Sequence, residues 1–192
     1  IGALIGDTLP SRIRGGRVDL TVPYRASLAD GRLDLKLIRP EVAMSNVDVL
    51  ARPDVLNAIV TAGSLRLRAD RFSLAQGPDD ALSWSIAVPE AVASDVRVQG
   101  TGPAAGEGVT AAAVTASGVS AGSTGDSIRA ERLLIEGLDI ELVRAAGGDL
   151  RLLRIVPDAP ATPAATAGGG APPIAIDRIE LQGARLQFEE RS

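Results

Sequence analysis

Short runs in which apolar and polar residues alternate constrain this chain most, because a period of two is typical of β-strands with one dry face. The run is clearest in Ile128–Val143, IRAERLLIEGLDIELV, and it recurs in Leu67–Leu74 and Ile176–Phe188. Each copy has an acidic residue, then Arg, then an apolar–any–apolar triplet; the pairs are Asp70-Arg71, Glu131-Arg132 and Asp177-Arg178. Arg132 and Arg178 are 46 residues apart. This self-similarity predicts stacked copies of one β unit.

The alternation changes phase within each copy. Leu65 and Leu67 share one face of a strand, and Phe72 and Leu74 then take it over beyond Asp70-Arg71. In the later copies the change falls at Gly137 and Gly183. A slip of one residue exchanges the two faces unless a bulge or a strand break absorbs it. We therefore expect a bulge or a break at these positions.

Other segments give simpler predictions. Alternation in Arg17–Tyr24 and Arg32–Leu37, around Ala29-Asp30-Gly31, predicts a β-hairpin, and Pro23 predicts that the first strand ends there or lies at an edge. Val55–Val60 reads either as a short helix or as a plain connection, and Asp149–Ile155 reads as a strand.

Two segments have weaker patterns. Residues 100–127 are rich in Gly, Ala, Ser and Thr, and only thin strands around Val109–Val119 are expected there. Residues 157–173 have low complexity and no large apolar side chain, so they predict a flexible loop within the sheet.

The fold class follows from these patterns. Hydrophobic residues make up 45% of the chain but aromatic residues only 2%, so the apolar content is aliphatic and suits strands. We expect a mostly β protein: an antiparallel, repeat-built sheet of roughly ten strands, curled into an open groove, with at most one or two short helices. Residues 1–192 are expected to form a single segment of a longer protein.

The composition disfavours most chemistry. The chain has no Cys and no His, and Lys36 is its single lysine, which alternates within a predicted strand. Thiolate nucleophiles and imidazole bases are therefore excluded, and nearly all zinc and haem sites with them. Asp79-Asp80 and Glu189-Glu190 are adjacent pairs, which point to opposite faces of a strand and make no dyad. We expect no enzymatic activity, no catalytic residue, no metal and no cofactor.

The charge and the length of the apolar runs limit the partners. A net charge of −4 gives no basic face for a nucleic acid and no polybasic patch for anionic lipid headgroups. No apolar run approaches the length of about 18 residues that a transmembrane helix needs.

The apolar stripe itself has two interpretations. It is either the closed interior of a structural β-domain, which could also contact protein partners, or an open groove that binds hydrocarbon chains. For the second interpretation the predicted groove-lining residues are Val18, Leu20, Val22, Leu33, Leu35, Leu37, Leu65, Leu67, Phe72, Leu74, Trp84, Ile86, Leu133, Ile135, Leu138, Ile140, Leu142, Ile179, Leu181, Leu186 and Phe188.

A family resemblance favours the groove. The run IRAERLLIEGLDIELVRAAGGDLRLLRIV, the Pro/Ala/Gly-rich segment and IAIDRIELQGARLQFEERS resemble the AsmA-like family, as does GGRVDLTVPYRASLADGRLDLKL upstream. Glu189-Glu190 departs from that family's pattern, in which an Asp is expected near the end of the last strand. The resemblance implies an envelope protein of double-membrane bacteria, anchored at the inner membrane through a segment outside residues 1–192. It also implies a periplasmic, bridge-like lipid-transfer function with a phospholipid or other acyl-chain lipid as ligand, possible envelope protein partners and no catalytic residue.

Overall fold

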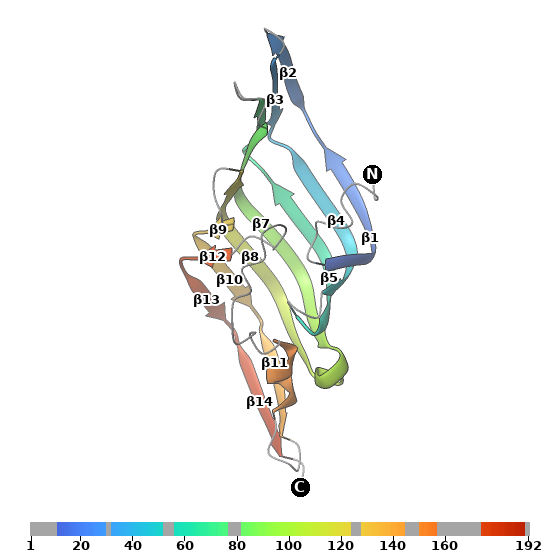
Figure 1. The fold of residues 1–192 in the computed structure, drawn as a ribbon. Coiled ribbons are helices and arrows are strands. Elements are labelled where there is room, and N and C mark those ends of the chain that lie inside the picture. Colours follow the sequence, from blue (N-terminus) through green and yellow to red (C-terminus); the bar gives the residue numbers. More distant parts are fainter. Residues whose placement is uncertain are drawn as a thin grey trace, which may run out of the picture.

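The described part of the chain forms one large sheet that is not closed into a barrel (Figure 1). The computed structural model describes residues 11–29, 32–51, 56–76, 82–123, 128–144, 150–156 and 174–190. Within these ranges the only helices are two short 3-10 turns, η1 (Gly102–Ala104) and η2 (Arg151–Ile155). The expectation of a mostly β, open and curled sheet with at most one or two short helices is confirmed.

The described strands line up as seven long strands, several of which are interrupted by short breaks. In spatial order these are β1 (Ser11–Thr21) with β2 (Tyr24–Ala29), β3 (Arg32–Ile38) with β4 (Glu41–Ala51), β5 (Ala58–Arg68) with β6 (Arg71–Gln76), β7 (Leu82–Gly100), β8 (Gly108–Gly122), β9 (Ile128–Ala130) with β10 (Arg132–Glu136) and β11 (Asp139–Arg144), and β12 (Ile174–Ile176) with β13 (Ile179–Gln182) and β14 (Arg185–Glu190).

The last two long strands are parallel, whereas the other pairings are antiparallel. Leu133 lies opposite Ile179, and Leu142 lies opposite Phe188. These partners are 46 residues apart, so the sequence repeat is also the register of the pairing. The predicted stacking of repeat copies is confirmed for these two. The first copy, in β5 and β6, is separated from them by β7 and β8.

The hairpin prediction is confirmed in part. Ala29 lies opposite Arg32 in the β2–β3 pair, and the turn residues 30 and 31 lie outside the described residues. The strand expected at Arg17–Tyr24 is divided at Val22 and Pro23, so β1 pairs with β4 and only β2 belongs to the hairpin. Both halves lie at an edge of the sheet, as expected for a strand containing Pro.

Two predictions of local structure were wrong, and a third is confirmed in position. Ala58–Val60 begin β5 instead of ending a helix, because the β-branched Ile59 and Val60 pair with β7. Arg151–Ile155 form η2 instead of a strand; Leu152 and Ile155 are three residues apart, which puts them on one side of a 3-10 turn. The strands expected around Val109–Val119 are confirmed in position, but they form one continuous 15-residue strand, β8. The predicted loop 157–173 lies outside the described residues.

Two lines of irregular backbone cross the sheet at right angles to the strands, and we call them the upper and lower creases. The upper crease, nearer β2, contains Val22, Pro40, Ala69, Pro89, Gly118, Glu131 and Asp177. The lower crease contains Gly16, Asn46, Gly63, Asp95, Ala112, Gly137 and Gly183. On every long strand the two crease residues are six positions apart.

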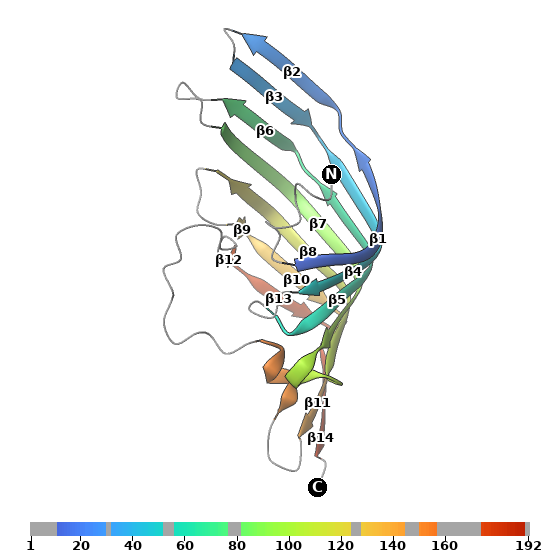
Figure 2. The same cartoon turned by 45° about the vertical axis from the view of Figure 1, so that its right-hand side comes forward.

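The backbone shows why these positions bend. At the lower crease Asn46, Asp95 and Gly137 have φ angles of 52°, 53° and 61°, and at the upper crease Gly118 has a φ of 62°. Other upper-crease positions are strand breaks or prolines. The break predicted at Asp70-Arg71 is confirmed, and the other two acidic–Arg pairs also lie at breaks, which the sequence pattern did not predict. Such residues shift the phase of a strand by one and bend it. The creases therefore divide the sheet into upper, middle and lower panels, and Figure 2 shows the resulting curl, with η1 and η2 on its hollow side.

Candidate functional site

The alternating apolar residues of neighbouring strands lie directly opposite one another, so they form rows on one face. Three long rows each cross all seven long strands. Two lie in the middle panel: Leu20–Val42–Leu67–Ala91–Ala116–Leu133–Ile179 and Val18–Met44–Leu65–Ala93–Val114–Ile135–Leu181. The third lies in the lower panel: Ile13–Val49–Val60–Val98–Val109–Ile140–Leu186. Every member of the three rows is apolar.

The upper panel continues the same pattern. Tyr24, Leu37, Phe72, Ile86 and Ala121 make one row across β2, β3, β6, β7 and β8. Leu35, Leu74 and Trp84 make the next. Three of the chain's four aromatic residues therefore lie in this panel.

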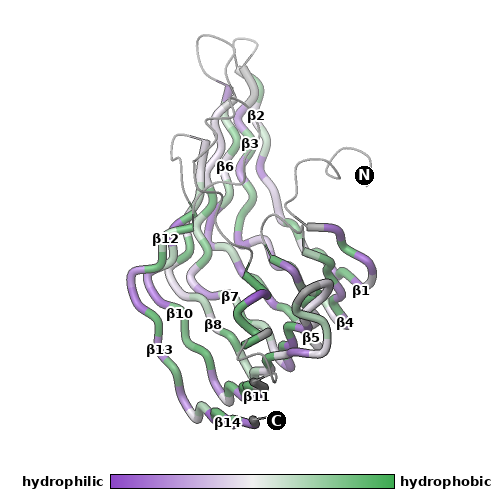
Figure 3. The backbone as a smooth tube through the Cα atoms, turned by 60° about the horizontal axis from the view of Figure 1, so that its bottom comes forward, coloured by the Kyte–Doolittle hydropathy of each residue, from purple (hydrophilic) through white to green (hydrophobic). Residues whose placement is uncertain are grey.

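The phase slips at the creases keep these rows on one face. In an unbroken strand Ile135 and Leu138 would point to opposite faces, because they are three residues apart. Gly137, with a φ of 61°, takes up the extra residue and returns Leu138 to the face of Ile135. Figure 3 shows the alternation of hydrophobic and hydrophilic residues along the strands. The apolar face is thus continuous across the three panels.

The opposite face is polar and carries ion pairs between strands. Arg132 Nη2 donates to Glu180 Oε2 at 2.6 Å, and Arg129 Nη2 donates to Asp177 Oδ1 at 3.3 Å. Arg178 Nη1 lies 3.5 Å from Glu180 Oε1. The hydrogen bond from Arg132 is the main reason why the pKa of Glu180 lies below its ordinary value.

The acidic–Arg pairs are therefore structural. At each break the acidic residue donates its backbone N–H to the neighbouring strand: Asp70 to Ala87, and Glu131 to Ser117. Asp177 does the same to Ala130. These bonds and the ion pairs hold the strands together at the upper crease.

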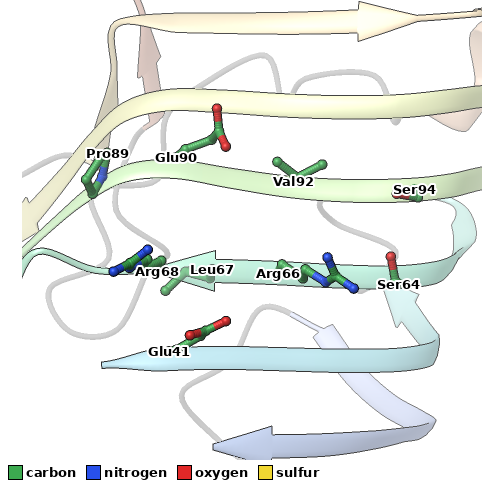
Figure 4. A pocket seen from close by; sticks show the side chains of 9 residues that line it. All are labelled: Glu41, Ser64, Arg66, Leu67, Arg68, Pro89, Glu90, Val92 and Ser94. Carbon is green, nitrogen blue, oxygen red and sulfur yellow. The ribbon is translucent and has the colours of Figure 1, made fainter. Parts of the chain in front are cut away.

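A shallow depression of about 440 Å³ lies at the middle panel (Figure 4). Arg66 and Arg68 of β5 line it, with Glu41 of β4 and Glu90 of β7 opposite Arg68. Most of its lining side chains belong to the polar face. Its two arginines and two glutamates balance in charge, so it offers no net attraction for an ion.

Nearly all of the predicted lining residues lie in or beside these rows. The exceptions are Val22, which lies on the upper crease between β1 and β2, and Leu33, which pairs with Leu28 in the hairpin and whose side chain is not described. Among the predicted lining residues, those on the edge strands are the most exposed: Leu20 is 63% exposed and Leu186 is 65% exposed.

Sequence reasoning missed the contribution of the central strands. Ala91, Ala93 and Ala116 of β7 and β8 belong to the middle rows, as do Val42 and Met44 of β4. Alanine is a weak hydrophobic signal, and the alternation of β8 is interrupted at Gly118. These residues are recognised as part of the apolar face only because they lie opposite large aliphatic residues on neighbouring strands.

The described residues cover the apolar face at one place only, its lower rim. Ile155 of η2 is 7% exposed and packs with Ala58 and Ala104, next to Val98 of the lower-panel row. A side chain at Gly100 would collide with the carbonyl of Ala104, so this glycine lets η1 fold over the face. No large side chain in the described ranges is fully buried, so the rest of the face has no second layer packed on it there.

Comparisons with protein-family models, with curated proteins and with solved structures found no match for this chain. In the part of the chain that the structure describes, no helix is long and apolar enough to span a membrane. The same ranges contain no group of three or more acidic residues placed to hold a metal ion.

Proposed function

We propose that this chain is a non-enzymatic segment of a lipid-transfer protein and that its apolar face binds the acyl chains of phospholipids. The proposed setting is the periplasm of a double-membrane bacterium, between the inner and outer membranes, in a protein of the AsmA-like family. The supporting sequence feature is the 46-residue unit, whose two copies pair in register.

The observation that carries the proposal is the continuity of the three long rows. Seven strands at a spacing of about 4.8 Å give each row a length of about 29 Å. The hydrocarbon core of a bilayer, about 30 Å thick, contains two acyl chains end to end, so a row is longer than one extended acyl chain and can accommodate it. Burial of hydrocarbon stabilises by about 0.8 kcal/mol per methylene. A lining without polar groups holds such a chain without fixing its position along the row.

The test is the phospholipid content of the purified protein, measured by mass spectrometry. We expect co-purified phospholipid in the wild type and its loss in Ile135→Asp and Ile140→Asp, with the strand signal in circular dichroism retained. Leu134→Asp is the matched control, because Leu134 lies between Thr115 and Glu180 on the polar face. It should keep its lipid.

A different result would support the alternative interpretation. If the wild type carries no lipid and Ile135→Asp unfolds the protein while Leu134→Asp does not, the apolar face is core. It is then covered by protein, and the chain is a structural or scaffolding β-domain.

A further inference from the structure

The 3-10 turn η2 lies on the same face that is proposed to bind lipid. Its Ile155 side chain packs with Ala58 and Ala104, and the partly buried Val98 and Leu152 pack against this cluster. Val98 is a member of the lower-panel row. An acyl chain that follows that row over Val98 therefore meets the cluster to which Ile155 belongs.

Asn57 fastens η2 to the sheet. Its backbone N–H donates to the carbonyl of Ile155 at 2.7 Å, and its side-chain Nδ2 donates to the carbonyl of Arg154 at 3.0 Å. The carbonyl of Asn57 in turn accepts from the N–H of Thr101 at 2.8 Å. One residue thus connects the start of β5, the end of β7 and η2.

The rest of η2 is bound loosely. Leu153 is 69% exposed and the adjoining Val156 is 65% exposed, so the apolar contact of η2 depends on the buried Ile155 and the partly buried Leu152. A short segment held by two apolar side chains and a few hydrogen bonds opens at a small fraction of the cost of global unfolding. It can be displaced while the sheet stays intact.

We propose that η2 is a displaceable internal cap that competes with acyl chains for the lower panel. This inference rests on the proposed function, because it concerns the same face. The apparent affinity for lipid is the intrinsic affinity multiplied by the fraction of molecules in which the cap is released, so a bound cap lowers it. Release of the cap lengthens the apolar surface that is open to lipid.

The experiment measures the dissociation constant of residues 1–192 for NBD-labelled phosphatidylcholine, by fluorescence titration after delipidation. Ile155→Ser removes the buried side chain of that cluster, and we expect it to tighten binding roughly tenfold. Asn57→Ala removes one of the hydrogen bonds to η2 without changing any residue of the rows, and we expect a smaller tightening. Leu153→Ser is the matched control on the same turn, and its affinity should equal that of the wild type.

The outcomes separate this inference from the proposed function. If the wild type binds the probe and Ile155→Ser binds it equally or more weakly, η2 is a fixed part of the lining and the cap is refuted. If Ile155→Ser does not fold, Asn57→Ala provides the test, and unchanged or weaker binding by that variant also refutes the cap. If no folded variant, the wild type included, binds the probe, the proposed function fails and the cap with it.

Discussion

Replacement of Gly137 by Ala tests whether the lower crease depends on its glycines. Gly137 has a φ of 61°, in the left-handed region that residues with a Cβ rarely adopt. A Cβ added there would lie 2.9 Å from the Cβ of Ala112 on β8, closer than carbon atoms pack. The substitution therefore introduces backbone strain and a collision between neighbouring strands at one point.

The expected loss of stability follows from these two effects. A residue with a Cβ in the left-handed region costs about 1–2 kcal/mol. An added methyl group in a tight contact costs about 1 kcal/mol or more. The loss of about 2–3 kcal/mol corresponds to a fall in melting temperature of roughly 4–12 °C for a domain of this size.

Two other glycines separate the effects. Gly102 has a φ of 55° but no atom within 4 Å of an added Cβ, so Gly102→Ala reports the backbone strain alone. An added Cβ at Gly63 would lie 2.9 Å from Asp95 Oδ2 without a positive φ at Gly63, so Gly63→Ala reports a collision alone. The assay is thermal unfolding, followed by the emission of the single tryptophan, Trp84. The reasoning is refuted if Gly137→Ala lowers the melting temperature no more than Gly102→Ala does.

Two further predictions concern the two faces of the sheet. Because the hydrogen bond from Arg132 lowers the folded-state pKa of Glu180, this carboxylate stabilises the fold above its unfolded pKa, and the contribution is lost as the pH falls through the lowered value. The difference in melting temperature between wild type and Glu180→Gln should therefore shrink as the pH falls below about 4.3, and a constant difference would contradict this. Trp84 is 40% exposed on the apolar face, so its emission should move to shorter wavelength when phospholipid is added to delipidated protein; glycerophosphocholine, which has no acyl chains, should leave it unchanged.

The sequence predicted the strands where large aliphatic residues alternate with charged ones. β3, β5, β10 and β13 fall where Leu and Ile recur at every second position, and the phase changes at Asp70-Arg71, Gly137 and Gly183 are real bends. The 46-residue repeat also anticipated a pairing, although not its parallel direction. Strand direction depends on how the chain crosses between copies, which a residue pattern does not record.

The remaining features depend on contacts between distant residues. β8 lies near the middle of the sheet, but its Ala and Thr residues become recognisable only opposite β7 and β10. η2 was mistaken for a strand because Leu152, Leu153 and Ile155 are strand-like residues, and its position is set by Asn57, about a hundred residues earlier. The predicted lining residues, apart from Val22 and Leu138, lie on strands, but the prediction omitted the small residues of the central strands, which only their neighbours identify.

Because the interval between the two creases is constant, the width and the length of the apolar surface are determined independently. Six residues of strand span about 20 Å, and this interval fixes the width of the middle panel on every long strand. The length in the perpendicular direction depends only on how many strands lie side by side, at about 4.8 Å each. Duplication of one 46-residue unit would therefore lengthen the apolar surface by one strand and leave its cross-section unchanged. In such a protein, the length of the apolar surface can increase in evolution by duplication of a unit, while its width is set within each unit.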